Sequence, residues 1–334
     1  MAALVQALLL AVAAAALTWS LVGVYAAAMT RSGKLEAPGA RSMHTTPVPT
    51  GAGLGIVAAI LISWPWWRVP AGAIEPALLG GMAGLGALSW LDDRRRLSAG
   101  VRLGAQATAV ALCLAVLPPE ARVLDWLSLF IERCLLAIAW IWFINLFNFM
   151  DGIDGLAGSE TIAVAGGFAA MAACAAAAPD PYWRLALVTA ASAIGYLAWN
   201  WHPARVFMGD AGSIPLGFVL GWLMLNLALG GQWAAGLILP LVFLADATCT
   251  LMGRAWRGEK PWQAHRQHFY QRAVLGGATP TGVVWRVIAV NVALLGLALA
   301  SMHHPLPALA VAVALVAALL AHLEILARRR TQRS

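Results

Sequence analysis

The feature that most constrains the fold is a series of long apolar stretches. A helix that crosses the hydrocarbon core of a bilayer needs about 20 predominantly apolar residues. Only 11% of the residues are charged, whereas a soluble domain carries about 25%. The sequence therefore predicts an all-α, polytopic integral membrane protein with ten or eleven transmembrane helices. The expected spans are 3–27, 51–67, 73–91, 103–118, 126–148, 160–178, 184–201, 212–230, 233–251, 281–301 and 305–326.

The distribution of basic residues predicts how these helices are oriented. If the stretches alternate across the membrane, one side carries 17 of the 22 Lys and Arg residues. The positive-inside rule then puts that side in the cytoplasm, with the N-terminus outside and the C-terminus in the cytoplasm. The net charge of +7 is attributed to topology and to anionic lipid, and no nucleic-acid partner is expected. The chain 1–334 is expected to form a single transmembrane domain with cytoplasmic loops at 28–50, 92–102, 149–159, 202–211 and 252–280.

Several aspartates fall where the predicted spans reach the cytoplasmic side. Carboxylates at membrane depth are costly unless they are paired, and they usually mark a functional site. Mg²⁺ is bound by oxygen ligands, typically one or two carboxylates together with substrate phosphates. The pattern therefore favours Mg²⁺ or Mn²⁺ and phosphoryl-transfer chemistry, although for any single aspartate a helix cap is an equally good interpretation. The residues are Asp92, Asp93, Asp151, Asp154, Asp210 and Asp246.

Glycines surround two groups of these aspartates. In MDGIDGLAG, the spacing of three residues puts Asp151 and Asp154 on one side of a turn, and the glycines allow a ligand to approach the backbone. In MGDAGS, Asp210 comes just before a predicted helix, whose N-terminal N–H groups favour phosphate. The last long loop contains HRQH, and basic side chains there can neutralise a diphosphate. These features together predict a phosphate-binding site on the cytoplasmic face.

Four segments, in this order, resemble a known enzyme family. They are LDDRRRLSAGVR, NLFNFMDGIDGLAG, VFMGDAGS and the loop with HRQH, within residues 31–275. The chain resembles the polyprenyl-phosphate N-acetylhexosamine-1-phosphate transferases of glycosyltransferase family 4, most of all the proteobacterial members that initiate O-antigen. The resemblance implies a bacterial inner-membrane enzyme with its active site on the cytoplasmic face. Such an enzyme transfers sugar-1-phosphate from a UDP-N-acetylhexosamine to undecaprenyl phosphate, releases UMP and requires Mg²⁺.

The resemblance also implies roles for individual residues. Asp210 and Asp151 match the metal site, whereas Asp92 and Asp93 match a pair that binds metal or acts as a base toward the lipid phosphate. The positions that match catalytic residues are Asp92, Asp93, Asp151, Asp154, His265 and His268. The positions that match binding residues for nucleotide, phosphate or sugar are Asn148, Asn200, Phe207, Arg102 and Arg266.

Some questions stay open at the level of sequence. HRQHFY stands where the peptidoglycan enzymes have three adjacent histidines, and HTTPVPTGAG lacks their lysine, so the sugar is not identified. An ion- or proton-coupled transporter is an alternative, although its acidic residues would be expected nearer the bilayer midplane. A phosphotransferase that acts on lipid headgroups is a second alternative, but its Asp motif is spaced differently. A homodimer is left open.

Overall fold

The computed structural model describes residues 2–33, 35, 47–67, 74–95, 97–174, 181–260 and 265–328, and the elements within them are α-helices joined by loops and turns. Parts of the predicted loops 28–50, 92–102 and 252–280, and most of the basic tail, lie outside the described residues. The helices are α1 (Ala2–Arg31), α2 (Leu54–Ile62), α3 (Trp64–Trp67), α4 (Ile74–Arg95), α5 (Ala99–Ala115), α6 (Leu129–Phe149), α7 (Leu156–Cys174), α8 (Trp183–Asn200), α9 (Asp210–Leu229), α10 (Trp233–Ile238), α11 (Leu241–Trp256), α12 (Phe269–Leu275), α13 (Pro280–Ala300) and α14 (Pro305–Arg328).

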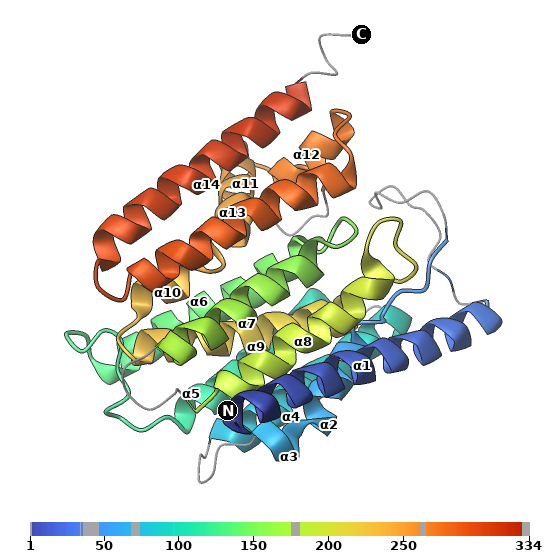
Figure 1. Cartoon of the computed structure of the whole chain (residues 1–334). Helices are drawn as coiled ribbons and strands as arrows, with labels where there is room; N and C mark the ends of the chain where they lie inside the picture. The colour runs from blue at the N-terminus through green and yellow to red at the C-terminus, as the bar shows by residue number, and fades with distance from the viewer. Residues whose placement is uncertain are drawn as a thin grey trace.

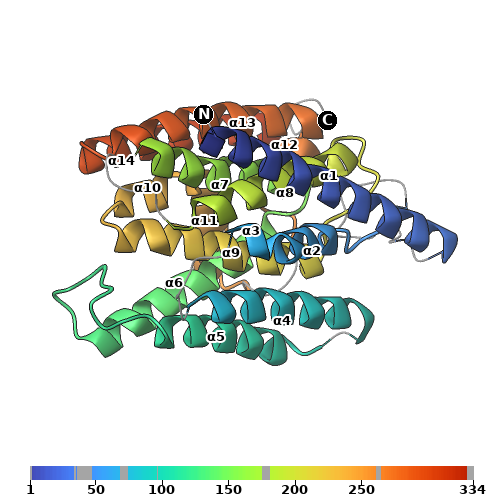
Figure 2. The same cartoon turned by 60° about the horizontal axis from the view of Figure 1, so that its bottom comes forward.

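The long helices lie side by side and run from one end of the molecule to the other (Figure 1). In the turned view, α4 and α5 form one flank, α13 and α14 form the opposite flank, and α7, α8 and α9 lie between them (Figure 2). Each helix satisfies its own backbone hydrogen bonds, so a bundle of this kind is compatible with a lipid environment. The prediction of an all-helical fold is confirmed for the described residues.

Helix α9 forms the centre of the bundle, and most of its side chains are buried. A Cβ atom on Gly217 would lie 3.0 Å from the Cα of Ile144 in α6, and one on Gly221 would lie 2.3 Å from Cδ1 of Trp140. Trp140 stacks on Phe218 with ring centroids 5.1 Å apart. Small residues therefore let α6 approach α9 closely, as is common between helices in membranes. This packing brings the end of α6 beside the start of α9, where two of the sequence motifs lie.

Seven helices among the described residues are long and apolar enough to cross a membrane, namely α1, α4, α6, α7, α9, α13 and α14. The other predicted spans fall on shorter or less apolar helices: 51–67 on α2 and α3, 103–118 on α5, 184–201 on α8, and 233–251 on α10 and α11. The breaks between α2 and α3 and between α10 and α11 lie next to Pro65 and Pro240. Proline lacks an N–H donor and its ring clashes with the preceding turn. The count of eleven spans stays a prediction.

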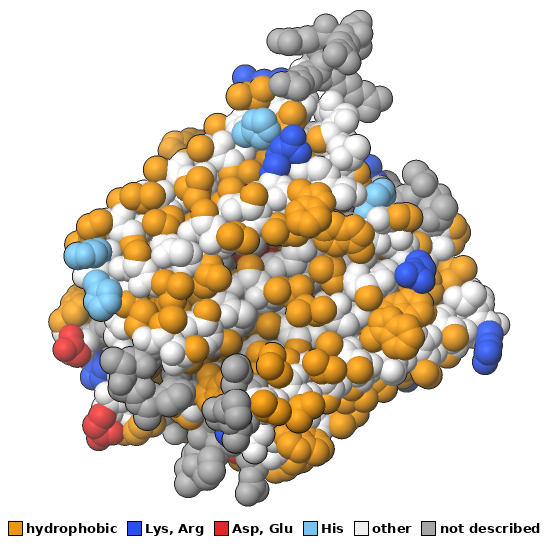
Figure 3. Space-filling model, in the orientation of Figure 1, with side chains coloured by type: hydrophobic (Ala, Val, Ile, Leu, Met, Phe, Trp, Pro, Cys, Tyr) orange, Lys and Arg blue, Asp and Glu red, His pale blue; other side chains and the backbone are white. Residues whose placement is uncertain are grey.

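The sides of the bundle expose many apolar side chains (Figure 3). Leu9, Val12, Ile138 and Val292 are examples from α1, α6 and α13, and each is well exposed. A soluble protein rarely exposes apolar patches of this extent. The surface therefore suits contact with lipid chains.

The two ends of the bundle differ in the loops they carry. The loops 150–155 and 201–209 and the short helix α12 lie at the same end, which we call the motif end (Figure 1). The loops 116–128 and 301–304 lie at the other end, which we call the distal end (Figure 1). Segments that are far apart in the sequence therefore share the motif end.

Candidate active site

Three charged side chains from three helices meet at the motif end. Asp92 lies in the last turn of α4, Arg102 in the first turn of α5, and Asp210 at the first position of α9. Arg102 Nη1 lies 3.2 Å from Asp92 Oδ2 and 3.7 Å from Asp210 Oδ2. The side chains are 10% exposed for Asp92, 35% for Asp210 and 45% for Arg102. Arg102 thus partly neutralises two carboxylates, and the cluster stays open to solvent.

The local sequence explains how this cluster forms. Leu97 N donates to Asp92 Oδ1 at 2.6 Å, so the Asp92 carboxylate closes the turn between α4 and α5. Ser98 caps α5 by accepting a hydrogen bond from Val101 N, as is typical of a helix N-cap. Asp210 stands at the N-terminal end of α9, where the helix dipole favours a negative charge.

The segment before Asp210 pairs with the segment that precedes α2. Phe207 N donates to Pro49 O at 2.9 Å, and Phe207 O accepts from Ala52 N at 3.0 Å. Gly209 has a φ of +68°, and a Cβ atom there would lie 2.8 Å from Gly51 N. A larger residue at this position would be strained and would separate the two segments. The glycine therefore fixes the entry of the chain into α9.

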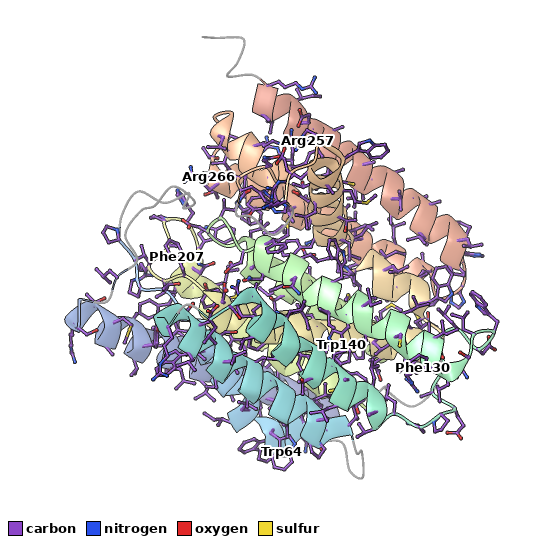
Figure 4. The ribbon with its side chains drawn as sticks, turned by 180° about the vertical axis from the view of Figure 1, so that it is seen from behind. Trp64, Phe130, Trp140, Phe207, Arg257 and Arg266 are labelled. Atoms are coloured by element: carbon purple, nitrogen blue, oxygen red, sulfur yellow. The ribbon has the colours of Figure 1, made fainter. Side chains whose placement is uncertain are left out.

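Labelled side chains mark the two ends of the molecule in Figure 4. Phe207, Arg257 and Arg266 lie at the motif end, whereas Trp64 and Phe130 lie at the distal end (Figure 4). Phe207 and Arg266 are half-buried. An aromatic ring and guanidinium groups therefore share the end that carries the carboxylates, and such groups can stack on a base or bind a phosphate.

The end of α6 contacts the first turn of α9. Ser213 Oγ donates to Asn148 Oδ1 at 2.5 Å, and Asp151 N donates to Asn148 O at 3.3 Å, so Asp151 follows in the same turn. Asp93 is exposed, and its Oδ2 would lie 3.9 Å from a Cβ atom on Gly51. Asn148, Asp151 and Asp93 thus lie on segments that border the Asp92–Arg102–Asp210 cluster.

Asp154 joins a different pair of loops. Its Oδ2 lies 2.7 Å from His202 Nδ1 and accepts from Ala204 N at 3.1 Å. The buried Asn200 side chain supports the same junction, because its Oδ1 accepts from Gly155 N at 2.9 Å and its Nδ2 donates to a backbone carbonyl six residues later. Asp154 and Asn200 therefore hold the loop after α6 against the loop after α8. Among the described residues, neither Asp154 nor Asn200 forms a hydrogen bond or an ion pair with Arg102.

The two predicted histidines occupy different depths. The rings of His265 and His268 stack with centroids 4.8 Å apart, but His268 is only 2% exposed. His268 Nδ1 lies 3.2 Å from Asp246 Oδ1, and the same carboxylate accepts from Phe269 N at 3.0 Å and Tyr270 N at 3.1 Å. Asp246, which the sequence places in the last turns of its span, instead lies well inside α11 and caps α12. Both oxygens of its carboxylate bond to residues at the start of α12 and hold that helix in place.

The loop after α6 also contacts α12. Tyr270 Oη donates to Phe149 O at 3.1 Å, and a Cβ atom on Gly152 would lie 2.1 Å from Tyr270 Oη. Burial, with the nearby Asp246 and Asp151 carboxylates, raises the pKa of Tyr270 well above its usual value. The hydroxyl therefore stays protonated and keeps its role as a donor.

Ion pairs and hydrogen bonds connect the end of α11 to the residues near His265. Glu259 accepts from the buried Arg254 at 2.8 Å, from Arg257 at 2.8 Å and from Gln267 at 3.0 Å. The Arg254 and Arg257 guanidinium groups lower the pKa of Glu259 to about 2. Burial and then neighbouring positive groups lower the pKa of His265 to about 4, so its ring is neutral at pH 7.

The oxygen donors at the motif end fit a magnesium ion shared with a substrate. Within the described residues, no group of three or more His, Cys, Asp or Glu side chains is arranged to hold a metal ion. Mg²⁺, however, usually takes one or two protein carboxylates and completes its shell with water and substrate phosphate. The Asp92 and Asp210 carboxylates share the Arg102 guanidinium, so they already face a positive charge. A set made only of oxygen donors suits Mg²⁺ or Mn²⁺ better than zinc.

Comparison with known proteins finds a family that part of the chain resembles. Residues 76–228 match the family model described as "Glycosyl transferase family 4", and the matched range includes Asp92, Arg102, Asp151 and Asp210. Over this range the chain is similar to that family. The similarity supports the predictions of an enzyme and of a transferase, and the seven apolar helices fit a membrane protein of this type. The match does not distinguish the predicted O-antigen subgroup from other members of the family.

Proteins similar to this chain come from several bacteria. A Bacillus subtilis protein named "Probable undecaprenyl-phosphate N-acetylglucosaminyl 1-phosphate transferase" is 28% identical over 73% of this chain and 71% of its own. A Mycolicibacterium smegmatis decaprenyl-phosphate N-acetylglucosaminephosphotransferase is 27% identical over 96% of this chain and 89% of its own. A Streptomyces coelicolor protein that carries only the general name of glycosyltransferase is 31% identical over 71% of this chain, which spans 57% of that relative.

Sequence reasoning missed residues that shape this site. His202, Ser213 and Glu259 bond to Asp154, Asn148 and a pair of arginines, respectively. Asp154 and His202 are 48 positions apart, and Asn148 and Ser213 are 65 positions apart, so no local sequence pattern predicts either hydrogen bond. The only signal in the sequence is that both partners stand beside a motif, which does not say which atoms meet.

Proposed function

We propose that this protein is a glycosyl transferase family 4 enzyme that transfers N-acetylhexosamine-1-phosphate from a UDP-sugar to undecaprenyl phosphate. N-acetylglucosamine is the first choice of sugar, because the names of the Bacillus and Mycolicibacterium relatives specify that sugar and a polyprenyl phosphate. UMP is the second product. The lipid-linked sugar starts a cell-surface glycan, O-antigen or a similar polysaccharide.

The Asp92–Arg102–Asp210 cluster is the observation that carries this proposal. It places two carboxylates and a guanidinium at a half-exposed position at the ends of apolar helices. A charged cluster in this position serves a reaction between a water-soluble donor and a lipid-bound acceptor, since both can reach the boundary. A transporter would be expected to place such groups near the bilayer midplane.

The chemistry requires little acid–base assistance from the protein. One oxygen of the acceptor phosphate attacks the phosphorus atom that carries the sugar, and the bond from that phosphorus to the bridging oxygen of UMP breaks. The acceptor is a phosphate monoester that is already ionised near pH 7, so a general base gains little. We assign Asp92 and Asp93 to orienting and balancing the charges of the two phosphate groups. An aspartate nucleophile is the less economical alternative, since it adds a covalent step.

Asp210 and Asp151 are the residues that would hold Mg²⁺, with Asn148 and Asp92 beside them. When bound, the ion supplies positive charge to the diphosphate and to the departing UMP. Arg102 already lies within 3.7 Å of Asp210, so its guanidinium is placed to contact the same phosphates. The protein therefore contributes a preorganised charge pattern, which is usually the largest part of phosphoryl-transfer catalysis.

The remaining predicted residues divide into contacts and supports. Phe207 stacks on the uracil ring, and Arg266 and the neutral His265 face the diphosphate and sugar. Asn200, Asp154 and His268 are buried or bonded side chains that position the loops. This division follows hydrogen bonding, because Asn200, Asp154 and His268 are already bonded to the loops or helix that they hold in place.

The proposal includes a membrane arrangement. The enzyme crosses a bacterial cytoplasmic membrane eleven times, with α2–α3 and α10–α11 each serving as one broken crossing. The motif end faces the cytoplasm, where UDP-sugars occur, and the acceptor enters laterally from the inner leaflet. The excess of basic residues on this side supports the orientation.

The test is a transfer reaction with purified full-length protein in detergent. Undecaprenyl phosphate and Mg²⁺ are supplied with radiolabelled UDP-GlcNAc, UDP-GalNAc or a UDP-6-deoxy-N-acetylhexosamine. We expect lipid-linked label and UMP in equal amounts, with UDP-GlcNAc the best donor. Label that enters sealed vesicles without a lipid product would instead support a transporter, and an absence of UMP with every donor would refute the proposal.

A further inference from the structure

A charged pair lies on the lipid-facing side of α13 and α14. Arg286 and His322 are exposed on these helices, both of which are apolar enough to cross a membrane. Apolar side chains cover much of this side of the molecule (Figure 3). An exposed arginine within a span is costly unless its charge reaches the headgroup region or an anionic partner.

The guanidinium of Arg286 is held in one orientation. Its Nη1 donates to Gly282 O at 2.5 Å, and its Nε donates to His322 Nε2 at 3.2 Å. A Cβ atom on Gly282 would lie 3.2 Å from Nη1, so glycine leaves room for this close approach. Because His322 accepts at Nε2, its neutral ring carries a proton on Nδ1. The pair therefore offers Arg286 Nη2, which has no bond within the described residues, and the His322 Nδ1–H.

The depth of the guanidinium matches a headgroup. Gly282 is two residues after Pro280, the first residue of α13, so its level is about 3 Å inside the helix end. The arginine side chain points back toward this end, as side chains on a helix do. The start of α13 follows α12, which lies at the motif end (Figure 1). Arg286 thus presents its charge close to the surface of the membrane leaflet on that side.

Tryptophans lie at the same end of the bundle as the charged pair. Trp285 is 56% exposed, and its ring meets Trp201 edge-on with centroids 5.4 Å apart. Farther along the same end, Arg205 lies over Trp199 at 4.9 Å. Tryptophan is enriched at the level of lipid headgroups, where its ring is apolar and its N–H is wet. A basic side chain between helices, with tryptophans at the same level, is the surface that an anionic lipid fits.

We propose that Arg286 and His322 form a binding site for the phosphodiester headgroup of an anionic phospholipid. One phosphate oxygen accepts from Arg286 Nη2 and another from His322 Nδ1, while the acyl chains lie along α13 and α14. The site is independent of the transfer reaction, because neither residue belongs to the Asp92–Arg102–Asp210 cluster. It would bind a structural lipid that holds α13 and α14, and through them α12, in place.

The experiment compares Arg286→Gln with Arg31→Gln in the full-length protein. Arg31 is an exposed basic residue at the end of α1, so this variant loses the same charge without the fixed guanidinium. Protein stripped of lipid in detergent is titrated with phosphatidylglycerol, phosphatidylcholine or inorganic phosphate, and bound ligands are counted by native mass spectrometry. We expect Arg286→Gln to weaken phosphatidylglycerol binding about fivefold or more, the factor that corresponds to about 1 kcal/mol per basic residue.

A second variant keeps the test decisive if Arg286→Gln folds poorly. His322→Phe keeps the ring shape and removes Nδ1–H, so it should also weaken phosphatidylglycerol binding, by a smaller factor. Equal losses in Arg31→Gln, or equal binding of phosphatidylcholine, would overturn the proposal. Binding of inorganic phosphate alone would show an anion site and no lipid site. A change of oligomeric state in Arg286→Gln with unchanged lipid binding would mean that a second copy of the chain covers this face.

Discussion

The distal and motif ends of the bundle use charged residues in different ways. At the distal end, the buried Glu132 accepts from the backbone N–H groups of Val123 and Leu124 and from the guanidinium of Arg122. Arg133 donates to carbonyl groups in the same loop. Every one of these partners lies within the loop before α6 or at its first turn. The charges of Arg122, Glu132 and Arg133 close this one loop on itself.

At the motif end, the partners come from separate helices. Arg102 of α5 joins Asp92 of α4 to Asp210 of α9. Asp154 bonds to His202 from the loop after α8. Several of these groups stay partly exposed, whereas Glu132 is fully buried. A carboxylate that is fully paired by its own loop stabilises structure, while a carboxylate shared between helices and open to solvent can exchange its partner for a substrate or an ion.

The largest effect that separates the two ends is expected for Asp210→Asn. The amide keeps the shape of the side chain but cannot balance Arg102 or bind a divalent ion well, so transfer should fall by about 100-fold or more. The measurement is lipid-linked label per minute with UDP-GlcNAc, together with the melting temperature.

Asp125→Asn provides a matched control, because Asp125 is an exposed aspartate in the distal loop. It should keep normal transfer. If Asp210→Asn turned over substrate normally with Mg²⁺, or if both variants lost activity equally, the contrast between the ends would not hold.

A second comparison sets His268→Ala against His303→Ala. His268 is buried and bonded to the Asp246 carboxylate that caps α12, so its loss should displace α12 and the loop that carries His265 and Arg266. A displacement of about 1 Å at a site can reduce turnover by about 100-fold. His303 lies in the distal loop and should tolerate alanine.

The decisive readouts for the histidine pair are kcat and KM for the UDP-sugar, measured with the melting temperature. A positioning role predicts that His268→Asn, which can still bond to Asp246, restores part of the activity. Equal effects of His268→Ala and His303→Ala would mean that the loop serves only as an anchor.

A smaller effect is expected where Asp154 meets His202. The pair is partly exposed, so its coupling should be about 0.5–1 kcal/mol, within the range of surface ion pairs. Asp154→Asn and His202→Gln should each lower kcat/KM a few-fold, and the double variant should be no worse than the poorer single variant. Additive losses in this double-mutant cycle would show that the two side chains act separately.

The sequence predicts the overall arrangement because it depends on long-range regularities. Alternating apolar stretches bring every second loop to one end, so Asp92 and Asp210 could be expected to meet although they are 118 positions apart. The same reasoning placed Asp246 at the cytoplasmic end of its span. The structure puts it in the second turn of α11, where it is buried and bonded to the start of α12.

Local partners could not be predicted for a different reason. Whether Asn200 contacts a nucleotide or the backbone depends on differences of about 1 Å in atomic position, which the sequence pattern does not encode. The amide of Asn200 bonds to Gly155 N and so holds two loops together. Asparagine suits either role, because it carries a donor and an acceptor. The motif therefore indicates the loop that matters and leaves the division between contacts and supports to the structure.

The smallest expected effect is a pH dependence of stability at His265. Burial, then the nearby His268 and Arg254, lower the pKa of this histidine from 6.5 to about 4 in the folded protein. Between these pH values the unfolded chain binds a proton that the folded protein excludes, so stability is intact above pH 6.5 and decreases as the pH falls toward 4. Because His265 is partly exposed, solvent weakens the effect, and His265→Gln should reduce the drop in melting temperature between pH 7 and pH 5 by about 2 °C or less. His303→Gln at the distal end should leave that drop unchanged. An identical pH dependence in wild type and His265→Gln would mean that the ring is as well solvated as His303, and that the two ends do not differ in how they treat a histidine.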